Sequence, residues 1–149
     1  MFCEMTEIVM PGDTNNLGTA FGGKIMQWID VVAAIAAMRF AKGIVVTASI
    51  DNLEFKKPIQ LGDIVTLKAA VNRSWNTSME VGVKVTAWNE KVGEVQACRA
   101  YLTFVALDGQ GRRCEIPSKI VAFLPDDPGR RRFEQAEKRR AARLAARQE

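Results

Sequence analysis

A single aspartate stands at the start of a long apolar run, and two adjacent glycines precede it in the same segment. Asp30 is followed by Val31–Met38, eight residues without a polar side chain. An ionised carboxylate is costly to bury unless it is paired or used. Gly22 and Gly23 are placed to open a helix, whose first backbone N–H groups can bind negatively charged atoms. The spacing therefore predicts an acid–base group and an anion site on one helix.

The composition excludes several other kinds of active site. The chain has no histidine, so neither a Ser-His-Asp nor a Cys-His site, nor a His-ligated zinc, can form within it. Its three cysteines, Cys3, Cys98 and Cys114, are odd in number and lack Cys-x-x-Cys spacing. We therefore expect no disulfide framework and no bound metal or cofactor, and a reducing compartment.

Length and apolar content indicate one globular domain with a substantial core, since 48% of the 149 residues are hydrophobic. The segment 1–10 has no basic region followed by a long apolar run, so no secretory signal is expected. The unbroken run Val31–Met38 is too short for a membrane span, which needs roughly 20 residues. We therefore predict a cytoplasmic protein without a membrane partner.

The elements that would position Asp30 follow from the apolar pattern. A helix is predicted from about Gly22 to Ala41, with Lys42 near its negative end and Gly43 after its C-cap. It is apolar on most sides, so other elements must cover it. Strand-like segments are expected at 4–10, 44–55, 64–71, 79–88 and 94–107. Because no second helix separates these strands, the sheet should be largely antiparallel, giving an α+β domain whose exposed edge favours a dimer.

The C-terminal part of the chain differs in composition from the rest. We divide the chain into a domain at 1–124 and a charged, Arg-rich helical tail at 125–149. Asp127 is placed to cap the tail helix, Pro128 to occupy its first position, and Glu134 to pair with Lys138. The weak apolar stripe predicts a solvated helix. Nucleic-acid binding is not expected, because acidic residues dilute the positive charge and aromatic residues do not alternate with it.

Four groups of residues between about Val9 and Pro117 resemble those of a known family. They are Pro11-x-Asp13-Thr14-Asn15-x-x-Gly18-x-x-Phe21-Gly22-Gly23-x-x-Met26-x-x-x-Asp30; Val45–Ala48 with Phe55-x-x-Pro58-Ile59-x-x-Gly62-Asp63; Thr77–Val81; and Phe104–Asp108 with Gly111 and Ile116-Pro117. Together they resemble the acyl-CoA thioesterases of the hot-dog fold, and among these the cytosolic acyl-CoA hydrolase group that includes the brain enzyme and its bacterial relatives. The resemblance implies a long central helix wrapped by a curved antiparallel sheet. It also implies hydrolysis of acyl-CoA to fatty acid and CoA, and assembly into dimers that form a trimer of dimers.

The resemblance also implies roles for individual residues. Asp30 would act as general base or nucleophile, Asn15 would orient water or the carbonyl, and the Gly23 N–H would bind the oxyanion. Asp30 of one subunit would face Asn15 and Gly23 of the other. Thr47, on the strand facing the helix, would support Asp30 by a hydrogen bond. The wider set expected to bind substrate or CoA comprises Gly22, Thr47, Lys57, Pro58, Arg73, Asn76, Thr77 and Ser78.

The chain departs from the family pattern at two places. Phe21 stands where many relatives have histidine, and Trp75-Asn76 replaces a common Gly-Arg pair. If that arginine contacts the CoA phosphates in relatives, Lys57 or Arg73 would have to replace it here. Met26, Trp28 and Ile29 are candidates for an acyl slot, although core packing explains them equally well.

Simpler interpretations remain for the same residues. Asp30 would be a structural acid at a dimer interface, and the glycine pair would allow close packing of the helix on a strand. Asn15 would be a turn residue and Thr47 an ordinary strand residue. Thr77 and Ser78 would be polar positions on an edge strand. At the level of function, the alternative is a non-catalytic acyl-CoA-binding regulator with the same fold. A hot-dog hydratase is disfavoured because such enzymes rely on histidine.

Overall fold

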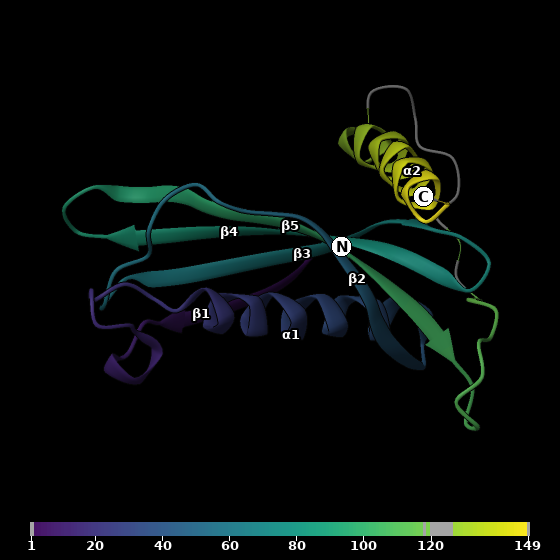
Figure 1. Cartoon of the computed structure of the whole chain (residues 1–149), viewed down its shortest axis with the longest axis horizontal. Helices are drawn as coiled ribbons and strands as arrows, with labels where there is room; N and C mark the ends of the chain where they lie inside the picture. Colours follow the sequence, from purple (N-terminus) through teal and green to yellow (C-terminus); the bar gives the residue numbers. More distant parts are fainter. Residues whose placement is uncertain (1, 118, 120–126, 149) are drawn as a thin grey trace.

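The computed structural model describes residues 2–117, 119 and 127–148 and places two helices on opposite faces of one sheet (Figure 1). The sheet is antiparallel, with five strands in the order β1-β3-β4-β5-β2. Helix α1 lies along one face and α2 on the other. The elements are β1 (Cys3–Ile8), the 3₁₀ turn η1 (Pro11–Asp13), α1 (Gly22–Ala41), β2 (Ile44–Phe55), β3 (Ile64–Ser74), β4 (Ser78–Asn89), β5 (Gly93–Leu107) and α2 (Pro128–Ala146).

Helix α1 begins and ends without a side-chain cap. Phe21 precedes its first turn, and the C-cap residue Lys42, which follows Ala41, donates its N–H to the Met38 carbonyl. Gly43 follows the cap as predicted, but Lys42 itself takes the left-handed conformation that glycine favours, with φ 55°. The predicted bounds of α1 and β2 are confirmed, whereas β3 continues to Ser74, beyond the predicted end at residue 71.

The core lies between α1 and the inner face of the sheet. Ile25, Ile29 and Val32 on α1 are each 1% exposed and pack with buried residues from the strands. Along β4 the alternation predicted from sequence is confirmed, since Met79 and every second residue up to Ala87 are buried. Alternation on a half-buried strand leaves the intervening side chains for the opposite face.

An apolar surface remains uncovered along the edge strand β2 and the neighbouring side of α1; we call it the open face. It consists of Ile44, Val46 and Phe55 on β2 and Met26, Val31 and Met38 on α1, each 38–55% exposed. Contiguous exposed apolar surface next to an unpaired strand edge is typical of an interaction site. No helix in the described part of the chain is long and apolar enough to cross a membrane.

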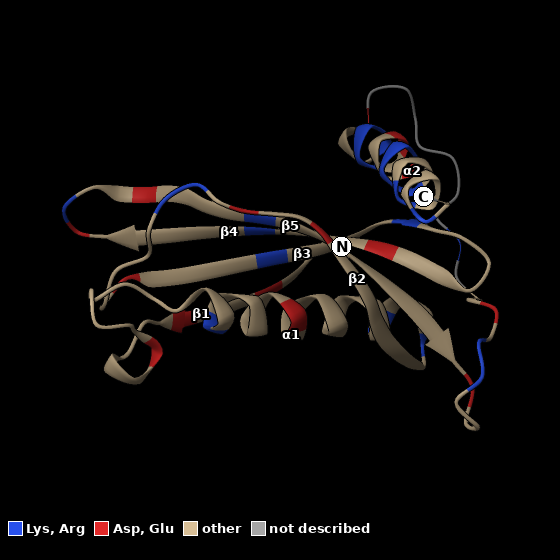
Figure 2. Ribbon diagram, in the orientation of Figure 1, with Lys and Arg blue, Asp and Glu red and all other residues tan. Residues whose placement is uncertain are grey.

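The α2 helix packs on the sheet, which corrects the prediction of a solvated tail. Its Ala136 is fully buried. Its Arg139 forms an ion pair with Glu80 of β4, and the Glu80 side chain is only 1% exposed. The predicted start is confirmed: Asp127 accepts a hydrogen bond from the Gly129 N–H at 2.7 Å, and Pro128 takes the first position. The predicted pairing of Glu134 with Lys138 is wrong, because Glu134 pairs with Arg130 at 2.9 Å. Figure 2 shows how densely Lys and Arg populate this helix.

Candidate active site

Asp30 lies in the middle of α1, half-buried, on the side that borders the open face. Its Oδ1 accepts a hydrogen bond of 2.6 Å from the Thr47 hydroxyl of β2. The predicted support of Asp30 by Thr47 is therefore present in the structure. One carboxylate oxygen is held in place, while Oδ2 has no hydrogen-bond partner among the described residues. A carboxylate oriented in this way can accept a proton or attack an electrophile.

The first turn of α1 presents free backbone donors. No described residue accepts a hydrogen bond from the N–H of Gly22 or Gly23, whereas the N–H groups of Lys24 and Ile25 both donate to the Phe21 carbonyl. A Cβ placed on Gly23 would meet no atom within 4 Å, so the space around it in a single chain is open. These N–H groups stand at the positive end of the helix dipole, where they can stabilise developing negative charge.

Asn15 organises the loop that leads into α1. Its Oδ1 accepts from the backbone N–H groups of Leu17 and Thr19, and its Nδ2 donates to the Thr19 hydroxyl at 2.8 Å. The turn role left open by the sequence is therefore present. An amide nitrogen carries two donors, so one N–H of Asn15 is still available to a substrate or a water molecule.

A pocket of about 390 Å³ opens beside the first turn of α1. It brings together three residues of the expected binding set, namely Gly22, Lys57 and Pro58. Phe55 and Thr19 also line it, and sequence reasoning had not assigned either of them to the site. The sequence signal of Thr19 is its spacing of four residues from Asn15, which lets the Asn15 side chain close the loop by hydrogen bonds to Thr19.

The remaining members of the expected set lie elsewhere, at the turn between β3 and β4. Arg73 Nε lies 3.0 Å from a carboxylate oxygen of Glu137, and its guanidinium stacks on Phe133, so α2 engages this cation. In the same turn Thr77 accepts a backbone hydrogen bond from β5, and Ser78 is the first residue of β4. Asn76 is exposed. These residues line neither the pocket at the first turn of α1 nor the surroundings of Asp30 in a single chain.

The three acyl-slot candidates do not act as a group. Trp28 and Ile29 are 8% and 1% exposed and belong to the core, whereas Met26 is 38% exposed and belongs to the open face. Core packing therefore accounts for Trp28 and Ile29, and of the three only Met26 lies where another molecule can reach it.

The thioesterase superfamily matches residues 17–94, which contain α1 with Asp30 and both glycines. The chain belongs to the thioesterase superfamily. This thioesterase-family chain is 43% identical over 125 residues to an uncharacterized acyl-CoA thioester hydrolase of Bacillus subtilis, covering 80% of the chain and 73% of the relative. It is 38% identical over 145 residues to mouse acyl-coenzyme A thioesterase 11, covering 95% of the chain but only 24% of that longer protein.

Solved structures of similar proteins share the whole fold. An acyl-CoA hydrolase from Staphylococcus aureus, in complex with butyryl coenzyme A, coenzyme A and coenzyme A disulfide, is 38% identical with a TM-score of 0.84. The match covers 99% of this chain and 91% of that one. A structure described as an apo-hexameric acyl-CoA thioesterase is 37% identical with a TM-score of 0.89, covering 97% and 92% of the two chains.

Alanine variants of the Staphylococcus aureus enzyme have also been solved, with an asparagine, an aspartate or a threonine replaced. In that enzyme the asparagine and aspartate are 15 positions apart, and the aspartate and threonine 17 positions apart. Asn15, Asp30 and Thr47 have the same two spacings in this thioesterase-family chain. The residues replaced in that relative thus correspond in type and spacing to Asn15 in the loop before α1, Asp30 on α1 and Thr47 on β2.

Proposed function

We propose that this chain is an acyl-CoA thioester hydrolase that converts acyl-CoA and water to a carboxylic acid and CoA. The carrying observation is the Asp30 carboxylate, which is half-buried, held at Oδ1 by Thr47, and without a hydrogen-bond partner at Oδ2 among the described residues. A carboxylate that can act as a base or nucleophile suits thioester hydrolysis, and several relatives are described as acyl-CoA thioester hydrolases. No observation favours the non-catalytic regulator over an enzyme.

The reaction can be written with groups that the chain itself supplies. Asp30 takes a proton from water as the water oxygen attacks the thioester carbonyl carbon, and the Gly23 N–H stabilises the resulting oxyanion. The tetrahedral intermediate collapses and the C–S bond breaks, and the CoA thiolate takes up the proton that Asp30 holds, which returns the carboxylate. In the alternative path, Asp30 attacks first and an anhydride is hydrolysed afterwards. The free amide N–H of Asn15 orients the water or the carbonyl. Neither path needs a cofactor, and CoA enters as part of the substrate.

The catalytic groups must come from two subunits. Gly23 and Asp30 are seven residues apart on α1, which is about 10 Å along the helix axis. Both must act on one carbonyl group, and an oxyanion donor has to lie within about 3 Å of the oxygen. A second chain packed on the open face can bring its own Gly23 and Asn15 opposite Asp30. The dimer through β2 and the assembly of three dimers belong to this proposal; some relatives are named hexameric.

The polar end of CoA is assigned to the pocket at the first turn of α1. Lys57 is an exposed cation there, next to Pro58 and Gly22. Arg73, the other cation considered, is already paired with Glu137, so we assign it to the docking of α2. Asn76, Thr77 and Ser78 would contact CoA only from another subunit. A cytoplasmic location also remains part of the proposal, supported by three free cysteines.

The direct test is release of free thiol from acyl-CoAs of increasing chain length. Wild type should turn over part of the panel, whereas Asp30→Ala and Asp30→Asn should lose activity by at least about a hundredfold. Glu90→Gln, which removes an exposed carboxylate in the turn after β4, is the control and should keep full activity. Absence of turnover by a folded wild-type protein across the whole panel would contradict the proposed function.

The shared site can be tested separately by mixing two inactive variants. Gly23→Pro removes the N–H in the first helical turn, where proline is tolerated, while Gly23→Ala keeps that N–H and serves as control. In heterodimers of Asp30→Ala with Gly23→Pro, one of the two sites regains both groups. An equal mixture of refolded subunits should therefore recover about a quarter of wild-type activity. No recovery, with heterodimers demonstrated by mass spectrometry, would place Asp30 and Gly23 in the same single-chain site.

A further inference from the structure

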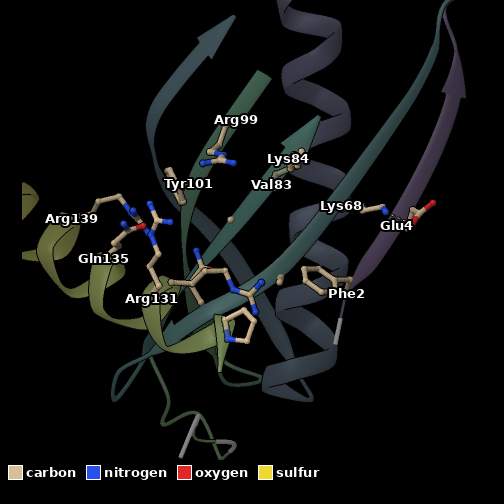
Figure 3. Close-up of a pocket in the computed structure, with 15 residues that line it drawn as sticks. Phe2, Glu4, Lys68, Val83, Lys84, Arg99, Tyr101, Arg131, Gln135 and Arg139 are labelled. Atoms are coloured by element: carbon tan, nitrogen blue, oxygen red, sulfur yellow. Dashed lines mark ion pairs between the residues drawn. The ribbon is translucent and has the colours of Figure 1, made fainter. Parts of the chain in front are cut away.

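A basic groove of about 780 Å³ lies between α2 and the strands of the sheet face opposite α1 (Figure 3). We call it the outer groove. Among the described residues that line it, one is acidic, Glu4. The cations that line it are Lys68, Lys84, Arg99, Arg131, Arg132 and Arg139. None of the residues assigned to the thioesterase reaction lines it.

One wall of the outer groove is a row of cations across the sheet. Lys68, Lys84 and Arg99 stand opposite one another on β3, β4 and β5. Figure 3 shows them on three successive strands. Like charges directly opposite in a sheet are destabilising, so fold stability does not account for this row. Lys68 pairs with Glu4 at 3.7 Å, whereas Lys84 and Arg99 form no ion pair within the described part of the chain.

The opposite wall is the first half of α2. Arg131 forms no ion pair with any described residue, and the guanidinium of Arg132 lies 5.2 Å from the ring centre of Phe2. Arg139, in contrast, is neutralised by Glu80 beneath the groove. Four cations on two walls, Lys84, Arg99, Arg131 and Arg132, thus remain without a carboxylate partner among the described residues.

Small residues form the floor between the walls. Ala70 and Gly82 line the groove. A Cβ at position 82 would lie 2.7 Å from the amide nitrogen of Asn72, which in turn donates to Glu80. Glycine at this position therefore keeps the floor low and leaves the network beneath it intact. The floor leaves room for a ligand between the two charged walls.

From this arrangement we propose that the outer groove is a second binding site, for a small polyanion carrying two or more phosphate groups. Cations on facing walls match a ligand whose negative charges are spread along its length, and guanidinium groups bind phosphate oxygens in pairs. The site is distinct from the thioesterase site, because the sheet separates it from Asp30. The shared chemistry is that of inorganic polyphosphate and of nucleoside polyphosphates. This inference goes beyond the proposed function and does not depend on it.

Binding is tested by calorimetric titration of the full chain with sodium tripolyphosphate and with ATP, using orthophosphate for comparison. Tripolyphosphate should bind more tightly than orthophosphate, and binding should weaken as salt is raised. Lys84→Gln/Arg99→Gln should lower the affinity at least about tenfold. The control Lys91→Gln/Arg147→Gln, which removes the same charge from exposed positions outside the groove, should leave affinity unchanged.

The two sources and the failure of the proposal give different results. A nucleotide site is identified if ATP binds more tightly than tripolyphosphate and Lys84→Gln/Arg99→Gln loses this binding. A polyphosphate site is identified if tripolyphosphate binds more tightly than ATP and the same variant loses this binding. The KM for acyl-CoA should be unchanged in this variant. The proposal is overturned if wild type binds neither probe, if both double variants bind alike, or if KM rises in parallel with the loss of binding. Because calorimetry needs no turnover, these outcomes are independent of whether the chain hydrolyses acyl-CoA.

Discussion

Replacing Arg139 by methionine should weaken the docking of α2 on the sheet at the ion pair that contains the most deeply buried carboxylate among the described residues. Glu80 is 1% exposed, and Arg139 donates to both its carboxylate oxygens, at 2.9 and 2.6 Å. Asn72 supplies the other hydrogen bond to Glu80, at 3.0 Å. Burial acts to lower the pKa of Arg139, but hydrogen bonding and charge interaction with Glu80, aided by Tyr101 and Asp51, raise it overall. Arg139 therefore stays charged throughout the pH range in which the protein can be studied.

The expected loss follows from leaving a buried carboxylate without its counter-ion. Breaking a buried pair by removing one partner costs about 3–5 kcal/mol. We expect a value near 3 kcal/mol, at the low end of that range, because α2 can lift and admit water to Glu80. The matched control is Arg130→Met, which breaks the exposed pair with Glu134 on the same helix and should cost about 0.3–0.5 kcal/mol. The double variant Glu80→Gln/Arg139→Met should be more stable than Arg139→Met, since it leaves no unpaired buried charge.

Urea unfolding at pH 7, followed both by circular dichroism and by tryptophan fluorescence, measures these differences. Trp75 donates its indole N–H to Glu137 of α2 at 3.0 Å, so its emission should respond to undocking. Asp30 lies on the other face of the sheet, and thiol release per folded molecule should stay within about twofold of wild type. A loss for Arg139→Met no larger than that for Arg130→Met would refute the assignment of Arg139–Glu80 as a major contribution to the docking of α2.

Three further predictions concern single side chains. Thr47→Val removes the hydrogen bond to Asp30 and should lower kcat for acyl-CoA by about tenfold or more, whereas Thr47→Ser keeps the hydroxyl and most of the activity. Burial raises the pKa of the Cys98 thiol from 9.0 to about 11. A hydrogen bond with the Arg99 backbone acts in the opposite direction and lowers this pKa by less than burial raises it. The unfolded thiol thus ionises first, and stability should fall by roughly 2–3 kcal/mol between pH 9 and 11, a drop absent from Cys98→Ala in urea titrations. Lys42→Gly relieves the left-handed conformation at the end of α1 and should raise the free energy of unfolding by about 0.5 kcal/mol; a decrease would contradict this.

Most of the fold was predictable because its signals are local. The apolar run around Asp30 and the alternation along β4 fix the long helix and the inner face of the sheet. The pairing of Thr47 with Asp30 could also be anticipated, since β2 directly follows α1 and runs back along it. The end of α1 was only half predictable: glycine at position 43 indicates a stop, but the left-handed conformation falls one residue earlier, at Lys42.

The docking of α2 could not be predicted, because its signals lie far apart in the sequence. Glu80 and Arg139 are 59 residues apart, and each alone reads as an ordinary surface charge. The weak apolar stripe of the helix likewise indicates a solvated element, although Ala136 is fully buried. The helix is held largely by ion pairs and by stacking of arginine on aromatic rings, which an apolar pattern does not reveal.

The alternation of β4 separates the two sites that we assign to this chain. Met79 and Val81 point towards α1 and help to fix the helix that carries Asp30, while Glu80 points away and anchors α2. Lys84 lies on the same outward side, two alternations further along, in the wall of the outer groove. Because side chains on a strand alternate with a period of two, one strand can shape both sites while the sheet keeps them apart. A ligand in the outer groove could therefore affect the thioesterase site only by shifting the sheet. The unchanged KM expected of Lys84→Gln/Arg99→Gln follows from this separation.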